Sequence, residues 1–128
     1  MTSKNILVAE DSKNSKLLVI EILKLLNCSY KIAVNGQEVL NFLENESFDL
    51  ILMDVHMPFM DGITTTRIIR NDYPAPYNQI PIIAITGKDD DSFACHFEEY
   101  GFNDYIKKPY SIEELELKLK GPFSDKLA

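Results

Sequence analysis

Five short apolar runs alternate along the chain with segments of helical period. The apolar runs suit buried strands, which we expect at residues 5–9, 30–34, 49–53, 81–85 and 104–106. The intervening segments place apolar residues at helical spacing, and we expect helices at residues 13–26, 36–45, 62–70, 90–100 and 112–120. Strands that alternate with helices of this length are typical of βα units around a parallel sheet. The sequence therefore predicts an α/β fold of five βα units.

The length and composition suit a single folded domain. The chain has 128 residues, and 45% of them are hydrophobic, which is enough to build one core. Gly121 and Pro122 are expected to end the last helix. We therefore expect the domain to occupy residues 1–120, with residues 121–128 as a tail or the start of a linker.

Charge, cysteine content and hydropathy argue against several protein classes. The net charge of −7 disfavours direct nucleic-acid binding, which requires a basic face. Two cysteines, Cys28 and Cys95, indicate neither a disulfide framework nor a zinc site. The first residues show no signal peptide, and no apolar run is long enough to span a bilayer. The sequence predicts a cytoplasmic protein whose domain makes no membrane contact.

Polar residues that could bind an ion or take part in a reaction follow four of the five expected strands. Glu10 and Asp11 follow the first strand and Asp54 follows the third. Thr86 follows the fourth strand and Lys108 the fifth. In an open parallel sheet, ligands bind outside the carboxyl ends of the strands. We therefore expect three acids, a hydroxyl and an amine to meet in one crevice, which suits a divalent cation, a phosphoryl group and its counter-charge.

The residue types in this crevice predict phosphoryl chemistry. Magnesium prefers oxygen ligands, which Glu10, Asp11 and Asp54 can supply. A carboxylate can also attack a phosphoryl group, and Asp54 is the expected nucleophile because it ends the central apolar run. Lys108 can neutralise phosphoryl oxygens. Each residue alone has an ordinary explanation, such as a turn, a cap or a solvated lysine, so the joint occurrence carries the prediction.

The segments that carry these residues resemble the receiver domain of two-component response regulators over about residues 4–120. The matching segments are residues 7–11, 49–62, 80–86 and 104–109. The resemblance implies a flavodoxin-like (βα)5 fold, in which a doubly wound parallel sheet of five strands has the order 2-1-3-4-5. It also implies a cis peptide bond between Lys108 and Pro109.

The resemblance further implies a phosphoacceptor site with a bound cation. Asp54 would accept a phosphoryl group from the phosphohistidine of a histidine kinase or a histidine phosphotransfer protein. Mg²⁺ would be bound by Asp11, Asp54 and the backbone carbonyl of His56, with Glu10 assisting. Glu10 stands where aspartate is commoner in the family, which is a mild departure. The domain would not be an enzyme. It would only catalyse its own phosphorylation and its own slow dephosphorylation.

A switch is also implied by the resemblance. Thr86 and Tyr105 resemble the family's switch pair, and Lys108 resembles its phosphate-binding lysine. As a hypothesis, Thr86 moves towards the phosphoryl group and Tyr105 turns inward to fill the vacated space. His56 and Lys88 are expected to line the path of the hydrolytic water, and Lys88 to make the phosphorylated form long-lived.

Two alternatives stay open beside the signalling switch. The first is a degenerate receiver that acts only as a docking scaffold, although such domains lose the acids or the lysine. The second is a phosphohydrolase of the haloacid-dehalogenase type, but the run from Asp54 through Val55 to His56 lacks that family's second acid. Residues 52–62 most resemble receivers attached to hybrid histidine kinases, so the chain is either a stand-alone regulator or part of a larger protein.

The first helix is expected to carry the docking surface for the phosphodonor. On a helical wheel, the arc expected to face the sheet holds Leu18, Val19, Ile22, Leu25 and Leu26. Leu17 and Ile20 fall on the opposite, polar side. Single surface hydrophobes are normal, but this helix begins directly after Asp11, so its outer face borders the crevice. We therefore expect Leu17 and Ile20 to contact the partner.

Overall fold

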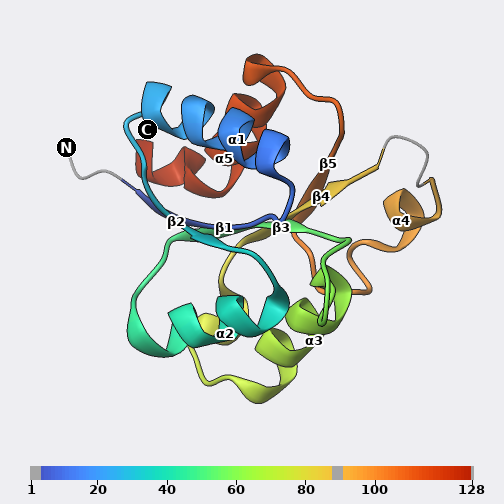
Figure 1. Ribbon diagram of the computed structural model, residues 1–128. Coiled ribbons are helices and arrows are strands. Elements are labelled where there is room, and N and C mark those ends of the chain that lie inside the picture. The colour runs from blue at the N-terminus through green and yellow to red at the C-terminus, as the bar shows by residue number, and fades with distance from the viewer. Residues whose placement is uncertain (1–3, 88–90, 128) are drawn as a thin grey trace.

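A parallel sheet of five strands forms the centre of the molecule (Figure 1). The computed structural model of the chain describes residues 4–87 and 91–127. The strand order is β2-β1-β3-β4-β5, which confirms the predicted flavodoxin-like topology. The strands are β1 (Asn5–Ala9), β2 (Ser29–Ala33), β3 (Leu50–Asp54), β4 (Ile82–Thr86) and β5 (Asp104–Lys107).

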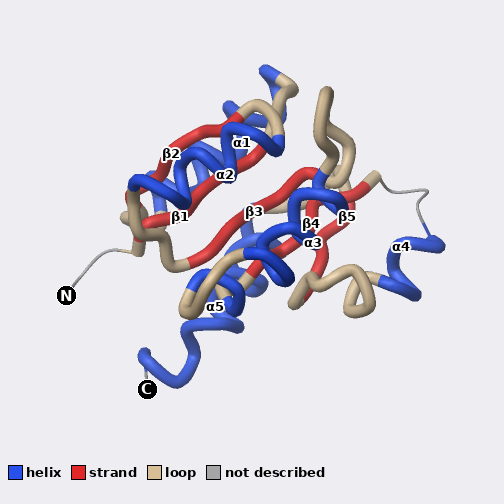
Figure 2. Tube along the Cα trace, turned by 90° about the horizontal axis from the view of Figure 1, so that it is seen from below, coloured by secondary structure: helices blue, strands red, loops and turns tan. Residues whose placement is uncertain are grey.

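Helices cover both faces of this sheet. They are α1 (Lys13–Leu25), α2 (Gly36–Asn45), α3 (Gly62–Asp72), α4 (Asp91–His96) and α5 (Ile112–Leu127), with a short 3₁₀ turn, η1 (Tyr77–Gln79). Figure 1 shows α1 and α5 on one face and α2 and α3 on the other. Figure 2 shows α4 apart from the other helices, beyond the β5 edge of the sheet. Within the described residues, no helix is both long and apolar enough to cross a membrane.

The core consists of one apolar cluster on each face of the sheet. Successive residues of a strand point to opposite faces, so Ile6 and Val8 of β1 pack with α1 and α5. Leu7 and Ala9 pack with α2 and α3 instead. Every residue of β3 and β4 is buried, as expected for central strands covered on both faces.

Side-chain caps begin three of the helices near the carboxyl edge of the sheet. Ser12 caps α1, Asn35 caps α2 and Asp61 caps α3, and each accepts a hydrogen bond from a backbone N–H of the first turn. Because these caps fix where the helices start, they also fix the loops that surround the crevice.

The ends of two helices differ from the prediction by more than two residues. The α-helical part of α4 ends at His96, and the following turns close at Gly101, which has a φ of 103°. The N–H of Phe102 donates to the carbonyl oxygen of Phe97. This hydrogen bond is typical of helices that end at a left-handed residue. Helix α5 continues to Leu127, so the expected end at residues 121 and 122 is wrong. A proline inside a helix removes one hydrogen bond and can bend the helix instead of ending it.

The buried stripe of α1 also differs from the prediction. Val19, Ile22 and Leu23 are fully buried, whereas Leu18 is 40% exposed and Leu25 is 66% exposed. Leu18 and Leu25 lie about 90–110° around the helix from the centre of the buried stripe. The helical wheel finds the apolar side, but the buried stripe is centred on Val19, about 90° around the helix from Leu18.

Candidate functional site

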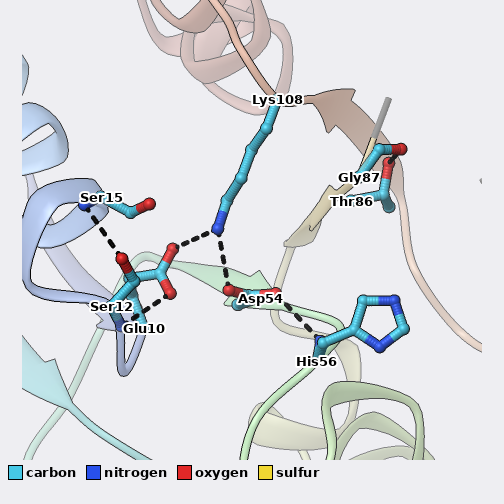
Figure 3. A network of polar contacts seen from close by, with 8 residues as sticks. All are labelled: Glu10, Ser12, Ser15, Asp54, His56, Thr86, Gly87 and Lys108. Carbon is cyan, nitrogen blue, oxygen red and sulfur yellow. Dashed lines mark hydrogen bonds and ion pairs between the residues drawn. The ribbon is translucent and has the colours of Figure 1, made fainter. Parts of the chain in front are cut away.

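The carboxyl edge of the sheet brings the predicted site residues together (Figure 3). In the β1–β3 ladder, Ala9 is the partner of Met53, so Glu10 and Asp54 follow side by side. Asp54 is the last residue of β3 and Thr86 the last of β4. Lys108 comes directly after β5 and extends towards both acids.

Lys108 bridges the two buried acids. Its Nζ lies 2.9 Å from Glu10 Oε1 and 3.1 Å from Asp54 Oδ2. Burial alone would lower the pKa of the lysine, but hydrogen bonds to Glu10 and Asp54, and their charges, outweigh it and raise that pKa. The amine is therefore held in its charged form between the two acids.

Glu10 is a fully buried carboxyl group with a strongly shifted pKa. Burial, together with the hydrogen bond and charge of Asp54, raises its pKa from 4.5 to about 7, although Lys108 and the N–H of Ser12 act in the opposite direction. The N–H of Ser12 donates to Glu10 Oε2 over 3.2 Å. The acids therefore repel each other, and one lysine does not relieve this repulsion fully.

The three acids are close enough together to be consistent with a magnesium site. One carboxylate oxygen from each of Glu10, Asp11 and Asp54 lies within 4.8 Å of the others. Opposite oxygens around Mg²⁺ are about 4.2 Å apart, because each lies about 2.1 Å from the ion. The donor set is therefore of the kind that this cation prefers, and small side-chain movements would complete it.

Asp54 has both carboxylate oxygens engaged. The backbone N–H of His56 donates to Oδ1 over 2.9 Å, and Lys108 donates to Oδ2. Figure 3 shows the imidazole of His56 directed away from Glu10 and Lys108. The predicted role of the His56 carbonyl as a metal ligand stays a prediction, and Lys88 lies outside the described residues.

Thr86 and Tyr105 lie on the same face of neighbouring strands. Tyr105 pairs with Ala84, two residues before Thr86. Thr86 is buried, and within the described residues its hydroxyl makes a long contact of 3.4 Å with the carbonyl of Gly87. The half-buried ring of Tyr105 packs at 4.9 Å from the ring of Phe97. The proposed switch pair therefore connects the crevice to the ring of Phe97, which follows α4.

Sequence reasoning missed Tyr110, which lies beside the site. The Lys108–Pro109 peptide bond is cis, and the buried Tyr110 follows it. Burial and the charges of Glu10 and Asp54 raise the pKa of its phenol, so the ring lies in the electrostatic field of the acids. Its hydroxyl has no hydrogen-bond partner in the part of the chain that the structure describes. An aromatic residue directly after Lys-Pro was the available signal.

A shallow groove adjoins the crevice on the α1 side. It is lined by Asn14, Ser15, Leu18, Lys108, Pro109 and Tyr110. Leu18, which the wheel had assigned to the sheet-facing arc, supplies part of its apolar wall. The groove therefore provides an apolar surface close to the amine of Lys108.

Comparison with known proteins identifies the family. The family model of the response regulator receiver domain matches residues 6–120. The chain belongs to this family. The receiver domain is 36% identical over 116 residues to the hybrid signal transduction protein dokA of Dictyostelium discoideum, covering 91% of this chain and 7% of that protein. It is 34% identical over 122 residues to the transcriptional regulatory protein CrdR of Helicobacter pylori, covering 95% of this chain and 56% of that protein.

Solved receiver domains have the same fold. The receiver domain of the sensor histidine kinase PA1611 from Pseudomonas aeruginosa has 28% identity and a TM-score of 0.82, covering 93% of this chain and 96% of that one. That crystal structure holds a magnesium ion coordinated in the active site cleft. The receiver domain of a histidine kinase from Syntrophus aciditrophicus has 30% identity and a TM-score of 0.86, covering 96% of this chain and 92% of that one.

The receiver domain is a module of two-component signalling, related to the receivers of hybrid kinases. The chain spans between 10% and 56% of the length of five curated relatives that it matches. Those relatives include transcription factors as well as hybrid kinases, so the receiver is shared between proteins of different output.

Proposed function

We propose that the chain is a phosphoacceptor switch in which Asp54 takes a phosphoryl group from the phosphohistidine of a partner. The observation that carries this proposal is the contact of Lys108 with both Asp54 and Glu10 in one buried crevice. An oxygen of Asp54 forms the new bond to phosphorus, and the phosphorus–nitrogen bond of the donor breaks. The released imidazole nitrogen keeps the electron pair and takes up a proton.

Glu10, Asp11, Asp54 and the backbone carbonyl of His56 would hold Mg²⁺. The observation that supports this ligand set is the close approach of the three carboxylates. The cation, when bound, supplies positive charge beside the transferring phosphoryl oxygens. The N–H of His56 holds Oδ1 of Asp54 and so fixes the orientation of the carboxylate.

Phosphorylation would change the partners of two side chains. The amine of Lys108 would exchange a carboxylate oxygen for a phosphoryl oxygen. The hydroxyl of Thr86, which makes a long contact with the carbonyl of Gly87, would donate to another phosphoryl oxygen. Its movement would open space on the face of β4 and β5 that Tyr105 then fills. The pair is thus the bistable element that a new charge biases.

The partner is a histidine kinase or a histidine phosphotransfer protein, and its docking surface includes α1. Leu17 is 53% exposed and Ile20 is half-buried, so Leu17 offers the larger contact of the two. The exposed part of Leu18 extends the apolar surface towards the groove beside Lys108. A partner helix laid along α1 would bring its histidine to the crevice.

Acetyl phosphate with Mg²⁺ tests the proposal directly, because this small donor needs no docking surface. Intact mass should show one phosphoryl adduct in the parent chain and none in Asp54→Asn. A docking scaffold would gain no adduct under these conditions. An adduct that persists in Asp54→Asn would show that the wrong residue has been assigned. We also expect the adduct to decay slowly by hydrolysis.

A further inference from the structure

Phe59, in the loop between β3 and α3, combines two unfavourable features. Its side chain is 96% exposed, and its φ is 67°, in the left-handed region that bulky residues rarely adopt. Among the described non-glycine residues, only Asn27 shares a positive φ, and Asn27 ends α1 in the ordinary way. Helix capping therefore explains Asn27 but not Phe59.

The surrounding backbone imposes this conformation. The N–H of Met60 donates to the carbonyl of Pro58 over 2.7 Å, which makes Phe59 the centre of a three-residue turn of the strained kind. Gly62 donates to Val55 over 2.9 Å and closes the loop at its base. A residue held in a strained conformation by its surroundings often belongs to a functional surface. The strain here keeps the phenyl ring out in solvent.

We propose that Phe59 is an anchor by which the histidine-bearing donor protein docks on the crevice. The inference rests on the proposed function, since it names a contact of the partner that phosphorylates Asp54. Aromatic anchors supply much of the binding energy of protein interfaces, because they bury a large area with little loss of side-chain freedom. The ring would bury most of its surface against the donor.

Distances place Phe59 inside the area that a donor must cover. Phe59 is three residues from Gly62, so their Cα atoms lie within about 11 Å. A Cβ on Gly62 would overlap the carbonyl oxygen of Asp54, so Gly62 packs directly on the phosphoacceptor's backbone. A typical interface covers about 800 Å² of each partner, which as a circle has a radius of about 16 Å. A donor centred on Asp54 therefore reaches Phe59.

The loop lies on the opposite side of the crevice from the groove beside α1. The N–H of Gly36, at the start of α2, donates to the carbonyl of Met60 and ties the loop to the α2 side of the sheet. The groove lined by Leu18 and Pro109 lies on the α1 side. A donor that brings its histidine to Asp54 would thus meet an apolar contact on each side of the acids.

Charge favours a donor protein over a second copy of this chain. Each copy carries a net charge of −7, and the buried acids at the crevice add a local negative field. Two such faces repel each other. A donor enters the same crevice because its phosphohistidine reacts there. The occupant of the surface around Phe59 is therefore the donor.

Variants that accept a left-handed backbone isolate the contribution of the ring. Asparagine and glycine both adopt positive φ readily, so Phe59→Asn and Phe59→Gly should fold with undiminished melting temperature. The matched control is Leu25→Gln, because Leu25 is 66% exposed but ends α1 about 18 Å from its start at the crevice.

The experiment compares a small donor with a protein donor. The small donor is acetyl phosphate, and the protein donor is a purified histidine phosphotransfer protein, phosphorylated on its histidine, that labels the parent chain. Transfer from the protein should fall about tenfold or more in both Phe59 variants, as loss of an interface anchor predicts. Acetyl phosphate labelling should stay within about twofold, and Leu25→Gln should match the parent with both donors.

Each contrary outcome has a distinct meaning. Equal rates of phosphoryl transfer from the protein donor to the parent and to the Phe59 variants would overturn the proposal that Phe59 is an anchor. A concentration-dependent dimer of the parent that Phe59→Asn abolishes in sedimentation, with transfer unchanged, would assign Phe59 to self-association instead. Absence of an acetyl phosphate adduct in the parent would overturn the proposed function itself, independently of Phe59.

Discussion

Replacing Glu10 by glutamine should stabilise the metal-free protein at pH 8 and change its stability little at pH 5. Glu10 is fully buried, and burial together with Asp54 raises its pKa from 4.5 to about 7. Glutamine has nearly the shape of the protonated acid but carries no proton to lose. The variant therefore removes the repulsion between the two carboxylates without opening a cavity.

The magnitude follows from the difference in proton affinity between the folded and unfolded chains. One pKa unit is worth about 1.4 kcal/mol, so a change from 4.5 to about 7 corresponds to roughly 3 kcal/mol. Because the folded protein holds this proton more tightly, the contribution to stability is fully present below pH 4.5 and is lost as the pH rises through about 7. At pH 8 the variant should therefore be more stable than the parent by up to about 3 kcal/mol.

Urea unfolding in EDTA, followed by circular dichroism between pH 5 and pH 8, measures this difference. Glu21→Gln is the matched control, since Glu21 is exposed on α1 and its variant should follow the parent at every pH. Added Mg²⁺ should stabilise the parent more than Glu10→Gln at pH 8, because the cation binds the ionised acids. A difference between parent and Glu10→Gln that stays constant with pH would refute the reasoning.

Three further variants test other parts of the site. Asp11→Ala should weaken Mg²⁺ binding at least about tenfold by isothermal titration, since one of the three proposed carboxylate ligands is lost; unchanged affinity would exclude Asp11 as a ligand. Thr86→Ala should accept phosphate at Asp54 yet lose the response of β5 in NMR spectra, and a full set of shift changes would contradict the switch. Gly62→Ala should lower the free energy of unfolding by about 2–4 kcal/mol, because its Cβ would meet the backbone of Asp54 and Val55; denaturant unfolding that matches the parent would show that the loop adapts.

The sequence predicted that these side chains would meet, because the geometry of a parallel sheet makes the ends of its strands neighbours. Glu10, Asp54, Thr86 and Lys108 each follow or end an apolar run, and the structure places them at one edge. Neither the ion pairs of Lys108 nor the unusual pKa of Glu10 can be read from the chain alone. Both depend on the distances between side chains, and these are set only when β1, β3 and β5 lie in one sheet.

Other features depended on packing that no local pattern contains. The exposure of Leu18 and Leu25 depends on which side of α1 packs on the sheet, which periodicity alone does not specify. The continuation of α5 beyond Pro122 reflects a proline that the helix accommodates. The left-handed backbone of Phe59 arises from hydrogen bonds of its neighbours, so its own residue type gives no signal of it.

The contact between Gly36 and the β3–α3 loop has a consequence for how sequences of this kind can diverge. A Cβ at residue 36 would collide with the hydroxyl of Thr65 and lie 2.8 Å from the side chain of Met60. An alanine there is therefore compatible with the fold only if both neighbours shrink or the loop shifts. Positions 36, 60 and 65 should consequently vary together among homologues, so that the start of α2 and the loop beside Asp54 are inherited as one unit.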